Sequence, residues 1–289
     1  MRRRLLNALV VAALPALASA AAPPERLAPS RWTVDDVVRA ESARELDLSP
    51  DGRLAAWVRS TVEDVEGEEK RVSRLWLSRE GSPDPLQLTR GGGRVSAPRF
   101  SPDGATIAFL SDRESPGEEG EGDGDGEEPK ARIWAIPAGG GEAYPVTRID
   151  RDVRGFRWRD AKTLVFAAEE SPSLREMERK EAKDRTVVVE DARRTPPVRL
   201  FEISLGDESP RRITRNADWI DSLSVSTDGK RAVVTAQRRL SYEYDQKIPP
   251  RTFLLDLETR RETPLFEDGE IRPRDVRWAA DGSGFYLAN

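Results

Sequence analysis

Apolar and polar residues alternate along the segment from Arg99 to Phe109, which a Ser-Pro-Asp-Gly sequence interrupts once. Phe100 lies before this interruption and Ile107 follows it, with small or polar residues at the intervening positions. Alternation with a period of two is typical of half-buried β-strands. In the interruption, proline presets the backbone for a turn and glycine supplies the positive φ angle that a tight hairpin needs. The segment therefore predicts two antiparallel strands joined by a tight turn.

The same turn recurs along the chain. The aspartates of its copies are Asp51, Asp103, Asp160, Asp228 and Asp281. Their spacing is similar from copy to copy and is widest between Asp160 and Asp228, and the copy at Asp160 is degenerate. Self-similarity at such a period indicates a repeat architecture.

Two further markers follow each turn. The aromatic residues of the first marker are Trp76, Trp134, Phe201 and Phe253, and the threonines of the second are Thr89, Thr147 and Thr214. The interval from aromatic residue to threonine is identical in all three copies, whereas the fourth copy has Phe266 where threonine is expected. The interval from the turn to the aromatic residue, in contrast, is shortest in the first and fourth copies and longest in the third. All the length variation therefore lies in one connection.

Each copy predicts four strands, and tandem units of this kind are the blades of a β-propeller. The expected fold is all-β, with blades over approximately 46–90, 95–148, 153–215 and 220–266, and the first hairpin of a fifth over 274–289. The variable connection joins the second strand to the third, so its insertions project from one face, which is a candidate binding face. Because the chain stops within a strand, we expect it to be a fragment of a longer protein; four blades with an additional hairpin is the alternative.

The N-terminus predicts a secretory signal peptide over residues 1–20. Three arginines precede the apolar run Leu5–Leu17, and the small residues Ala18–Ala20 follow it. This run is shorter than the roughly 20 residues that span a bilayer, although an uncleaved anchor is the alternative. Residues 21–45 predict a linker and a short helix, with Thr33 as N-cap and Asp36 completing a capping box. We therefore expect a periplasmic or secreted protein.

Composition limits the chemistry of the 289 residues. The formal net charge of −5 mixes both signs, with 34% charged residues, and favours neither nucleic acid nor a membrane as partner. The chain has no histidine and no cysteine, which excludes disulfides, a Ser-His-Asp triad, a cysteine nucleophile and the usual zinc ligands. We predict no catalytic, cofactor-binding or metal residue, no cofactor, and no peptidase activity of these residues alone.

The insertion Glu114–Glu128 of the second blade is acidic and rich in glycine, as is typical of a solvated loop. A calcium site at Asp123, Asp125 and Glu127 is the alternative. In an EF-hand register, however, Arg132 stands where the closing glutamate is required.

The long insertion of the third blade begins with a capping box, Ser173–Glu176, that predicts a charged helix up to about Asp184. Clustered carboxylates near this helix are candidates to bind the N-terminal amine of a substrate; a solvated helix with i,i+4 ion pairs is the alternative. These candidate residues are Glu169, Glu170, Glu176 and Glu178.

Five tryptophans fall at repeat positions on the predicted strands. They are Trp57, Trp76, Trp134, Trp158 and Trp278. Residues fixed by a repeat favour packing between blades, and a set of side chains that stack on a ligand is the alternative.

The order of these features resembles the N-terminal β-propeller of the prolyl oligopeptidase family of serine peptidases, especially its bacterial acylaminoacyl-peptidase and dipeptidyl-peptidase-like members. The resemblance covers residues 30–289 and rests on the helix at Thr33–Val37, the Ser-Pro-Asp-Gly turns within Leu48–Trp57 and Phe100–Gly104, and the charged insertion ending in Thr195–Leu200. The turn alone is shared with the periplasmic propeller of the Tol system.

The resemblance implies a propeller that caps the active site of an α/β-hydrolase domain in cis and admits short peptides as substrates. In dipeptidyl-peptidase relatives, glutamates on a propeller excursion bind the substrate amine, which again points to Glu169–Glu178. The alternative function is a periplasmic propeller without enzymatic activity that binds a protein or envelope ligand through its insertion face.

Overall fold

The computed structural model describes residues 32–65, 67–114, 130–170, 174–182, 195–240, 248–266, 271, 273 and 275–288. The chain divides into two compact units, Met1–Val38 and Arg39–Asn289, each of which is described by itself. The predicted signal peptide lies outside the described residues and stays a prediction.

The first unit contains the helix α1 (Val34–Val38). The Thr33 hydroxyl accepts a hydrogen bond from the Asp36 amide at 3.2 Å, and the Asp36 carboxylate accepts one from the Thr33 amide at 2.7 Å. This reciprocal pair is a capping box. Its hydrogen bonds lower the pKa of Asp36. The predicted helix and its first-turn chemistry are confirmed.

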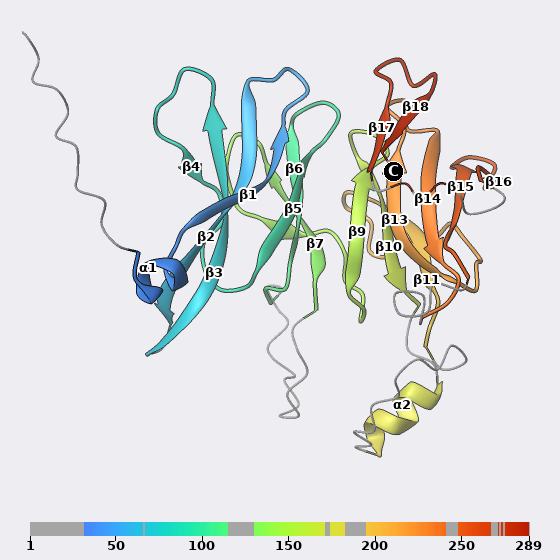
Figure 1. The fold of residues 1–289 in the computed structure, drawn as a ribbon, viewed down its shortest axis with the longest axis horizontal. Coiled ribbons are helices and arrows are strands. Elements are labelled where there is room, and N and C mark those ends of the chain that lie inside the picture. The colour runs from blue at the N-terminus through green and yellow to red at the C-terminus, as the bar shows by residue number, and fades with distance from the viewer. Residues whose placement is uncertain are drawn as a thin grey trace, which may run out of the picture. The chain divides into compact units, whose positions relative to one another are not determined.

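The second unit is built of antiparallel sheets that follow one another in chain order (Figure 1). The first sheet comprises β1 (Ser42–Leu48), β2 (Leu54–Val65), β3 (Glu68–Arg79) and β4 (Leu86–Gln87). The second comprises β5 (Val95–Phe100), β6 (Thr106–Ser111), β7 (Arg132–Pro137) and β8 (Tyr144–Pro145). The third comprises β9 (Val153–Trp158), β10 (Thr163–Glu169), β11 (Val198–Ser204) and β12 (Arg211–Arg212). The fourth comprises β13 (Trp219–Val225), β14 (Arg231–Gln237), β15 (Arg251–Asp256) and β16 (Glu262–Pro264), and the hairpin of β17 (Asp275–Trp278) and β18 (Phe285–Ala288) follows.

A single parallel pair, Val198 with Trp219, connects the third and fourth sheets. The helix α2 (Leu174–Glu181) lies in the connection between β10 and β11, where the sequence predicts a helix. Neither helix in the described part of the chain is long and apolar enough to cross a membrane. The predicted all-β fold of four-stranded antiparallel blades is confirmed.

Apolar cores lie between successive sheets. In β6, Ile107 and Phe109 join the core shared with the first sheet, whereas Ala108 and Leu110 join the core shared with the third. In β10, Phe166 and Val165 likewise belong to two different cores. Because both faces of these strands are covered, their sequences are continuously apolar, as expected for strands buried on both sides.

Side chains close the Ser-Pro-Asp-Gly turns. In the second sheet the Ser101 hydroxyl lies 2.5 Å from the Asp103 carboxylate and accepts a hydrogen bond from the Thr106 amide at 3.0 Å. The same carboxylate accepts a hydrogen bond from the Ala105 amide at 3.1 Å. Gly104 has a φ angle of 71°, which glycine adopts without steric cost. The turns at Asp51 and Asp228 repeat this pattern.

The constant interval from aromatic residue to threonine has a structural cause. The buried hydroxyl of Thr147 accepts a hydrogen bond from the Ile133 amide at 2.9 Å. Thr89 and Thr214 accept equivalent hydrogen bonds at 2.9 and 3.0 Å from the amide that precedes the aromatic residue in their own sheets. Each threonine thus attaches the segment after the fourth strand to the third strand and fixes the number of residues between them.

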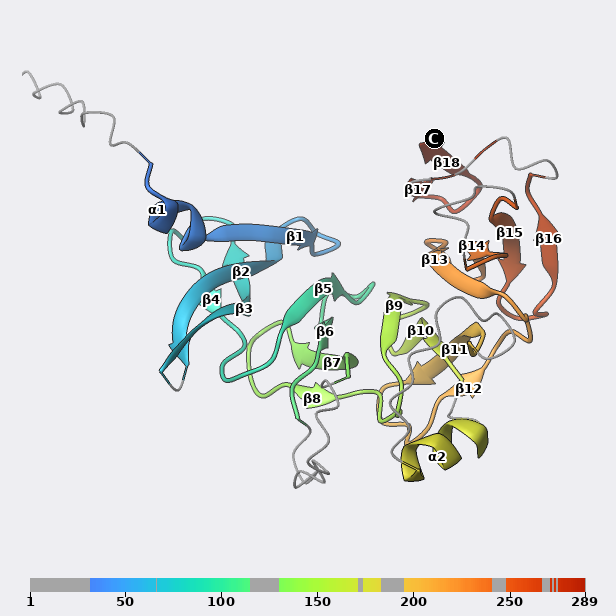
Figure 2. The ribbon, with the colours of Figure 1, turned by 60° about the horizontal axis from the view of Figure 1, so that its bottom comes forward.

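The first strands of successive sheets contact one another in series, β1 with β5, β5 with β9, β9 with β13 and β13 with β17 (Figure 2). Two indole groups bridge them. Trp158 Nε1 donates to the Arg99 carbonyl at 3.0 Å, and Trp278 Nε1 donates to the Ser224 carbonyl at 3.1 Å. These bonds fix the register of one sheet against the next.

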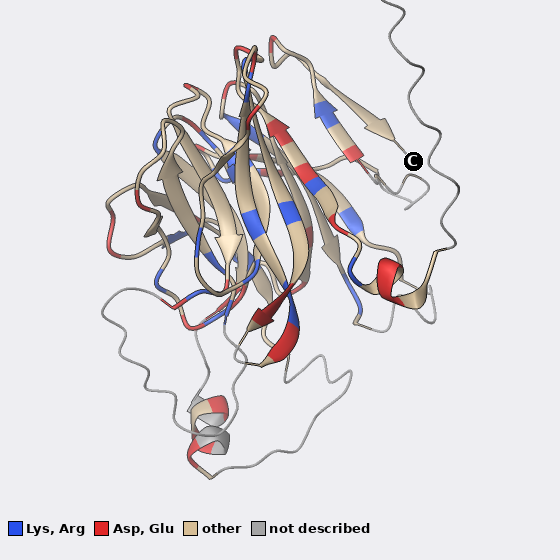
Figure 3. Ribbon diagram, turned by 90° about the vertical axis from the view of Figure 1, so that its left-hand side faces the viewer, with Lys and Arg blue, Asp and Glu red and all other residues tan. Residues whose placement is uncertain are grey.

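Charged residues of both signs lie along the strands of the first sheet (Figure 3). Its strands β2 and β3 pair over their whole length. The rings of Trp57 and Trp76 stack across these strands, with centroids 6.0 Å apart, and Arg59 lies over Trp76 at 5.3 Å. Both rings are half-buried, whereas Trp134 and Trp158 are buried in the cores between sheets.

Candidate functional site

The predicted glutamates Glu169 and Glu170 lie where β10 ends, at the same end of the third sheet as the start of β11. The pairing of Glu169 with Val198 places the long insertion at this end. We call this end of the sheets, opposite the Asp-Gly turns, the insertion end. Three of the four predicted carboxylates meet arginines here.

Arg151 joins β10 to the helix α2. Its Nη2 atom lies 2.6 Å from Glu176, its Nη1 atom lies 3.5 Å from Glu169, and its Nε atom donates to the Glu170 carbonyl at 2.8 Å. Arg154 Nη2 lies 2.7 Å from the other oxygen of Glu169. The two carboxylates therefore bind arginines that come from the preceding connection and from β9.

Glu170 is paired with Arg199 of β11 and with Arg212 of β12. Burial favours the neutral form of Glu170, but hydrogen bonds and charge from the two arginines outweigh burial and lower its pKa. Glu178, in contrast, is exposed on α2 and makes no ion pair with any described residue. The structure thus brings Glu169, Glu170 and Glu176 together around arginines and leaves Glu178 apart.

The cluster contains more positive than negative charge. It consists of Glu169, Glu170, Glu176, Arg151, Arg154, Arg199 and Arg212. A substrate amine that binds one of these carboxylates must compete with an arginine for it. The role of the four glutamates in binding a substrate stays a prediction.

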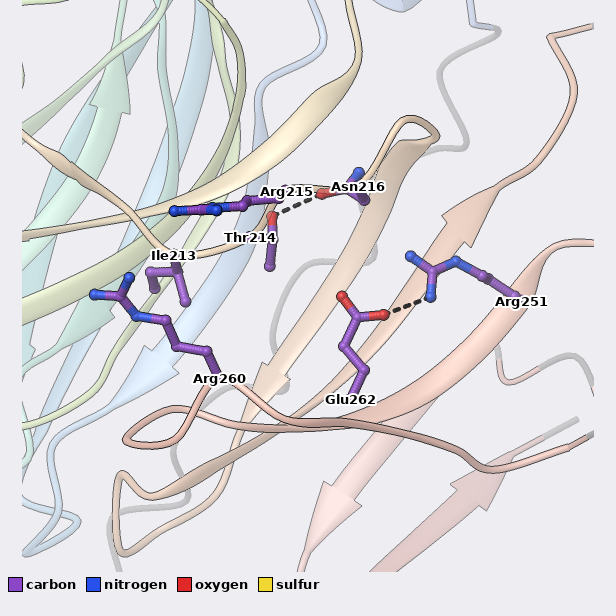
Figure 4. Close-up of a pocket in the computed structure, with 7 residues that line it drawn as sticks. All are labelled: Ile213, Thr214, Arg215, Asn216, Arg251, Arg260 and Glu262. Atoms are coloured by element: carbon purple, nitrogen blue, oxygen red, sulfur yellow. Dashed lines mark hydrogen bonds and ion pairs between the residues drawn. The ribbon is translucent and has the colours of Figure 1, made fainter.

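A cleft of about 530 Å³ lies next to this cluster, between the third and fourth sheets (Figure 4). It is lined by Ile213, Thr214, Arg215, Asn216, Arg251, Arg260 and Glu262. Ion pairs and hydrogen bonds connect the side chains along one side of the cleft. Arg251 Nη1 lies 2.7 Å from Glu262, and its Nε atom donates to Asp218 at 2.5 Å.

Asn216 connects the cleft to the glutamate cluster. Its amide nitrogen donates to the Asp218 carboxylate at 2.8 Å, and its side-chain oxygen accepts a hydrogen bond from Thr214 at 2.7 Å. Its backbone carbonyl accepts a hydrogen bond from Arg199 Nε at 2.8 Å, and Arg199 is a partner of Glu170. One polar network therefore runs from the insertion end into the cleft.

The cleft is accessible to an anion. Arg215 and Arg260 are exposed, and their guanidinium groups have no hydrogen-bond or ion-pair partner among the described residues (Figure 4). Planar guanidinium groups bind carboxylates and phosphates through paired hydrogen bonds. In the sequence, Arg215 stands out only as the residue after the repeated threonine Thr214, and nothing singles out Arg260.

A second cleft of about 520 Å³ occupies the equivalent position between the first and second sheets. It lies between the Leu88–Arg90 segment and the buried ring of Trp134. Both clefts are lined by a threonine of the second repeated marker and by the arginine that follows it, Thr89–Arg90 and Thr214–Arg215. The polar network that leads to the glutamate cluster distinguishes the cleft at Arg215.

No group of acidic residues in the described ranges could hold a metal ion. The alternative calcium ligands Asp123, Asp125 and Glu127 lie outside those ranges.

No family model matches the chain. Over 126 residues, which are 44% of this chain and 17% of the relative, it is 31% identical to the uncharacterized peptidase YuxL of Bacillus subtilis. Among solved structures, it is similar to a puromycin-hydrolyzing peptidase of Mycobacterium tuberculosis, with a TM-score of 0.51 at 14% identity. It is also similar to the acylaminoacyl peptidase of Pyrococcus horikoshii, with a TM-score of 0.50 at 18% identity.

The two structural matches cover 82% and 79% of this chain but only 32% and 33% of the peptidases. The chain thus spans about one third of the length of these proteins. Together with the repeated antiparallel sheets, the matches define the fold as a β-propeller. The resemblance to the propeller of prolyl oligopeptidase-type peptidases, predicted from the sequence, is confirmed.

Proposed function

We propose that this chain is the substrate-gating propeller of a secreted serine peptidase that hydrolyses short peptides. The observation that carries the proposal is the combination of sequence similarity to a peptidase with the propeller fold of peptidases. Because the chain contains no histidine, it has no Ser-His-Asp triad of its own. The catalytic residues would belong to an α/β-hydrolase domain in the same polypeptide.

In this proposal the insertion end contacts the peptide. Glu169, Glu170 and Glu176 would accept the N-terminal amine of the substrate, with Glu178 of α2 nearby. Their arginine partners support the proposal in one respect, because they hold the carboxylates in fixed positions and, at Glu170, lower the pKa and so favour the ionised form. An incoming ammonium group would then share the carboxylates with the arginines.

The first test is the coding sequence that follows Asn289. The proposal expects a Gly-x-Ser-x-Gly sequence followed by an aspartate and a histidine within about 300 residues, in the order typical of α/β-hydrolases. Further blades followed by a stop codon would instead favour a binding propeller without catalysis. The complete protein should hydrolyse short peptides, and the 289-residue chain alone should not.

The second test addresses substrate binding in the complete protein. Glu170→Gln removes a charge that would bind the substrate amine, so we expect KM to rise about tenfold for peptides with a free N-terminus, with little change in kcat. For the same peptides with an acetylated N-terminus, KM should not change. Glu202→Gln is the control, because Glu202 is also paired with arginines but lies at the turn end of the third sheet. An equal effect on acetylated peptides would contradict amine recognition.

A further inference from the structure

Four of the five first strands carry a charged residue at an equivalent position, next to the turn that follows the strand. The penultimate residues of β1, β5, β9, β13 and β17 are Asp47, Arg99, Arg157, Ser224 and Arg277. Since consecutive first strands contact one another (Figure 2), these side chains belong to one side of the sheets. We call the end of the sheets at which the Asp-Gly turns lie the turn end. It is opposite the insertion end, and the glutamate cluster is not part of it.

The two carboxylates near this series already have partners. Asp47 Oδ2 accepts a hydrogen bond from the Phe100 amide at 2.8 Å, and Asp47 Oδ1 lies 4.0 Å from Arg99 Nη1. Asp275 lies 2.8 Å from the Nε atom of Arg277 on its own strand. Neither acid is within ion-pair distance of Arg157.

Arg157 is therefore a partly buried cation without a direct counterion. Its one hydrogen bond to a described residue runs from Nη1 to the Phe156 carbonyl at 2.7 Å, and no described carboxylate lies within 4.0 Å of its nitrogens. A guanidinium group has five N–H donors. Burial, and secondarily the charge of Arg99, lowers the pKa of Arg157, against the weaker influence of Asp47 and Asp275. A partly buried charge of this kind is stabilised by an anion that satisfies its donors.

We propose that Arg157, together with Arg99, binds the carboxylate group of a ligand at the turn end of the first strands. Asp47, Arg99 and Arg157 sum to one positive charge, which matches a monovalent carboxylate. The planar fork of Arg157 would bind the two carboxylate oxygens side by side. A small organic acid and the C-terminus of a peptide share this chemistry. The inference does not depend on the proposed peptidase function, since it concerns neither the insertion end nor catalysis.

The test is a titration of the 289-residue chain with sodium acetate at constant ionic strength, with chloride as the replaced ion. The readout is the chemical shift of the Trp158 indole N–H and of the arginine Nε–H groups in an NMR spectrum. Trp158 is a suitable reporter because its indole donates to the Arg99 carbonyl. We expect saturable shifts in the wild type and binding at least about tenfold weaker in Arg157→Gln, which lacks the charge.

Arg157→Lys keeps the charge but loses the planar fork, and its affinity should be intermediate. Arg53→Gln is the matched control: it removes one exposed arginine beside the first turn and should bind as the wild type does. If Arg157→Gln does not fold, as judged from the dispersion of its spectrum, Arg157→Lys and Arg99→Gln replace it. Both should bind acetate more weakly than the wild type.

Acetyl-Ala-Ala with a free carboxyl group and its C-terminal amide distinguish the source of the carboxylate. Tighter binding of the free acid than of acetate would identify a peptide terminus, and equal binding would identify a small organic acid. Binding of the amide as strongly as the acid, no saturation in the wild type, or wild-type binding by Arg157→Gln would overturn the proposal.

Discussion

In each of the first three sheets, a threonine hydroxyl accepts a hydrogen bond from a third-strand amide. In a β-sheet, the acceptor of such a bond is usually a backbone carbonyl. The third-strand amide of Ile133 lies in a buried region and donates to Thr147, which itself is fully buried. A buried amide that loses its acceptor carries a free-energy cost of about 1–3 kcal/mol. At the scale of single residues, the repeat therefore depends on side-chain oxygen atoms in addition to apolar packing.

Thr147→Val removes this acceptor without changing the shape of the side chain. We expect it to lower the free energy of unfolding by about 1–3 kcal/mol, measured by urea denaturation, and to accelerate hydrogen exchange of the Ile133 amide. Thr106→Val is the matched control, because the Thr106 hydroxyl has no partner among the described residues and its loss should change stability by less than about 0.5 kcal/mol. Equal effects of the two substitutions would show that the Thr147 hydroxyl contributes nothing.

The sequence indicates such threonines through their spacing but does not reveal the partners of charged residues. The constant interval from aromatic residue to threonine is visible because it recurs, whereas Glu170 binds Arg199 and Arg212, which lie far along the chain beyond the long insertion. With 34% of the residues charged, many pairings are compatible with the sequence. Only the registers of β10, β11 and β12 select among them.

At the scale of elements, the Asp-Gly turns also connect neighbouring sheets. A Cβ atom added to Gly229 would lie 2.0 Å from the Arg159 carbonyl oxygen, which belongs to the turn of the preceding sheet. A Cβ atom on Gly104 would lie 3.4 Å from Pro50, and one on Gly282 would lie 3.4 Å from Asp228. Glycine is thus required at these turns both for its φ angle and, at Gly229, for the close approach of the next turn.

Two glycine substitutions separate these requirements. Gly52→Ala places a side chain at a φ angle of 72° with no atom within 4 Å, so it should cost only the conformational strain of about 1–2 kcal/mol. Gly229→Ala adds the clash with Arg159 and should destabilise the protein by about 1–3 kcal/mol more. Urea denaturation of the two variants measures this difference. Equal loss of stability would mean that the two turns do not pack closely in solution.

At the scale of the whole molecule, the fold was predictable and the clefts were not. The turns, the strand alternation and the third-strand aromatic residues each recur. A copy with a degenerate sequence, such as the turn at Asp160, can therefore be assigned by comparison with the other copies. The cleft at Arg215 and Arg260 depends on how the third sheet packs on the fourth. Arg157 is a similar case, because its lack of a counterion is defined only once Asp47 and Asp275 are placed by other sheets.

The aspartates of the recurring turns make the stability of the whole molecule depend on pH. Hydrogen bonds from the neighbouring serine hydroxyls lower the pKa of Asp51, Asp103 and Asp228, and the Ser283 amide does the same for Asp281. A carboxyl group whose pKa is lower in the folded than in the unfolded state stabilises the fold above its unfolded pKa of about 3.9. This stabilisation is lost as the pH falls through the folded-state pKa. Asp47 affects the pH dependence of stability in the opposite direction, because burial raises its pKa in the folded state.

Since the lowered groups outnumber Asp47, we expect the urea midpoint to fall progressively once the pH decreases below about 5. The measurement is a series of urea titrations from about pH 7 to pH 3 at constant ionic strength. Asp103→Asn removes one of the titrating groups, and Ser101→Ala removes the hydroxyl that lowers the pKa of Asp103. Both variants should be less stable at neutral pH and show a shallower pH dependence than the wild type. A wild-type midpoint that stays constant over the whole series, or variants with the wild-type slope, would contradict a contribution of the turn carboxylates to stability.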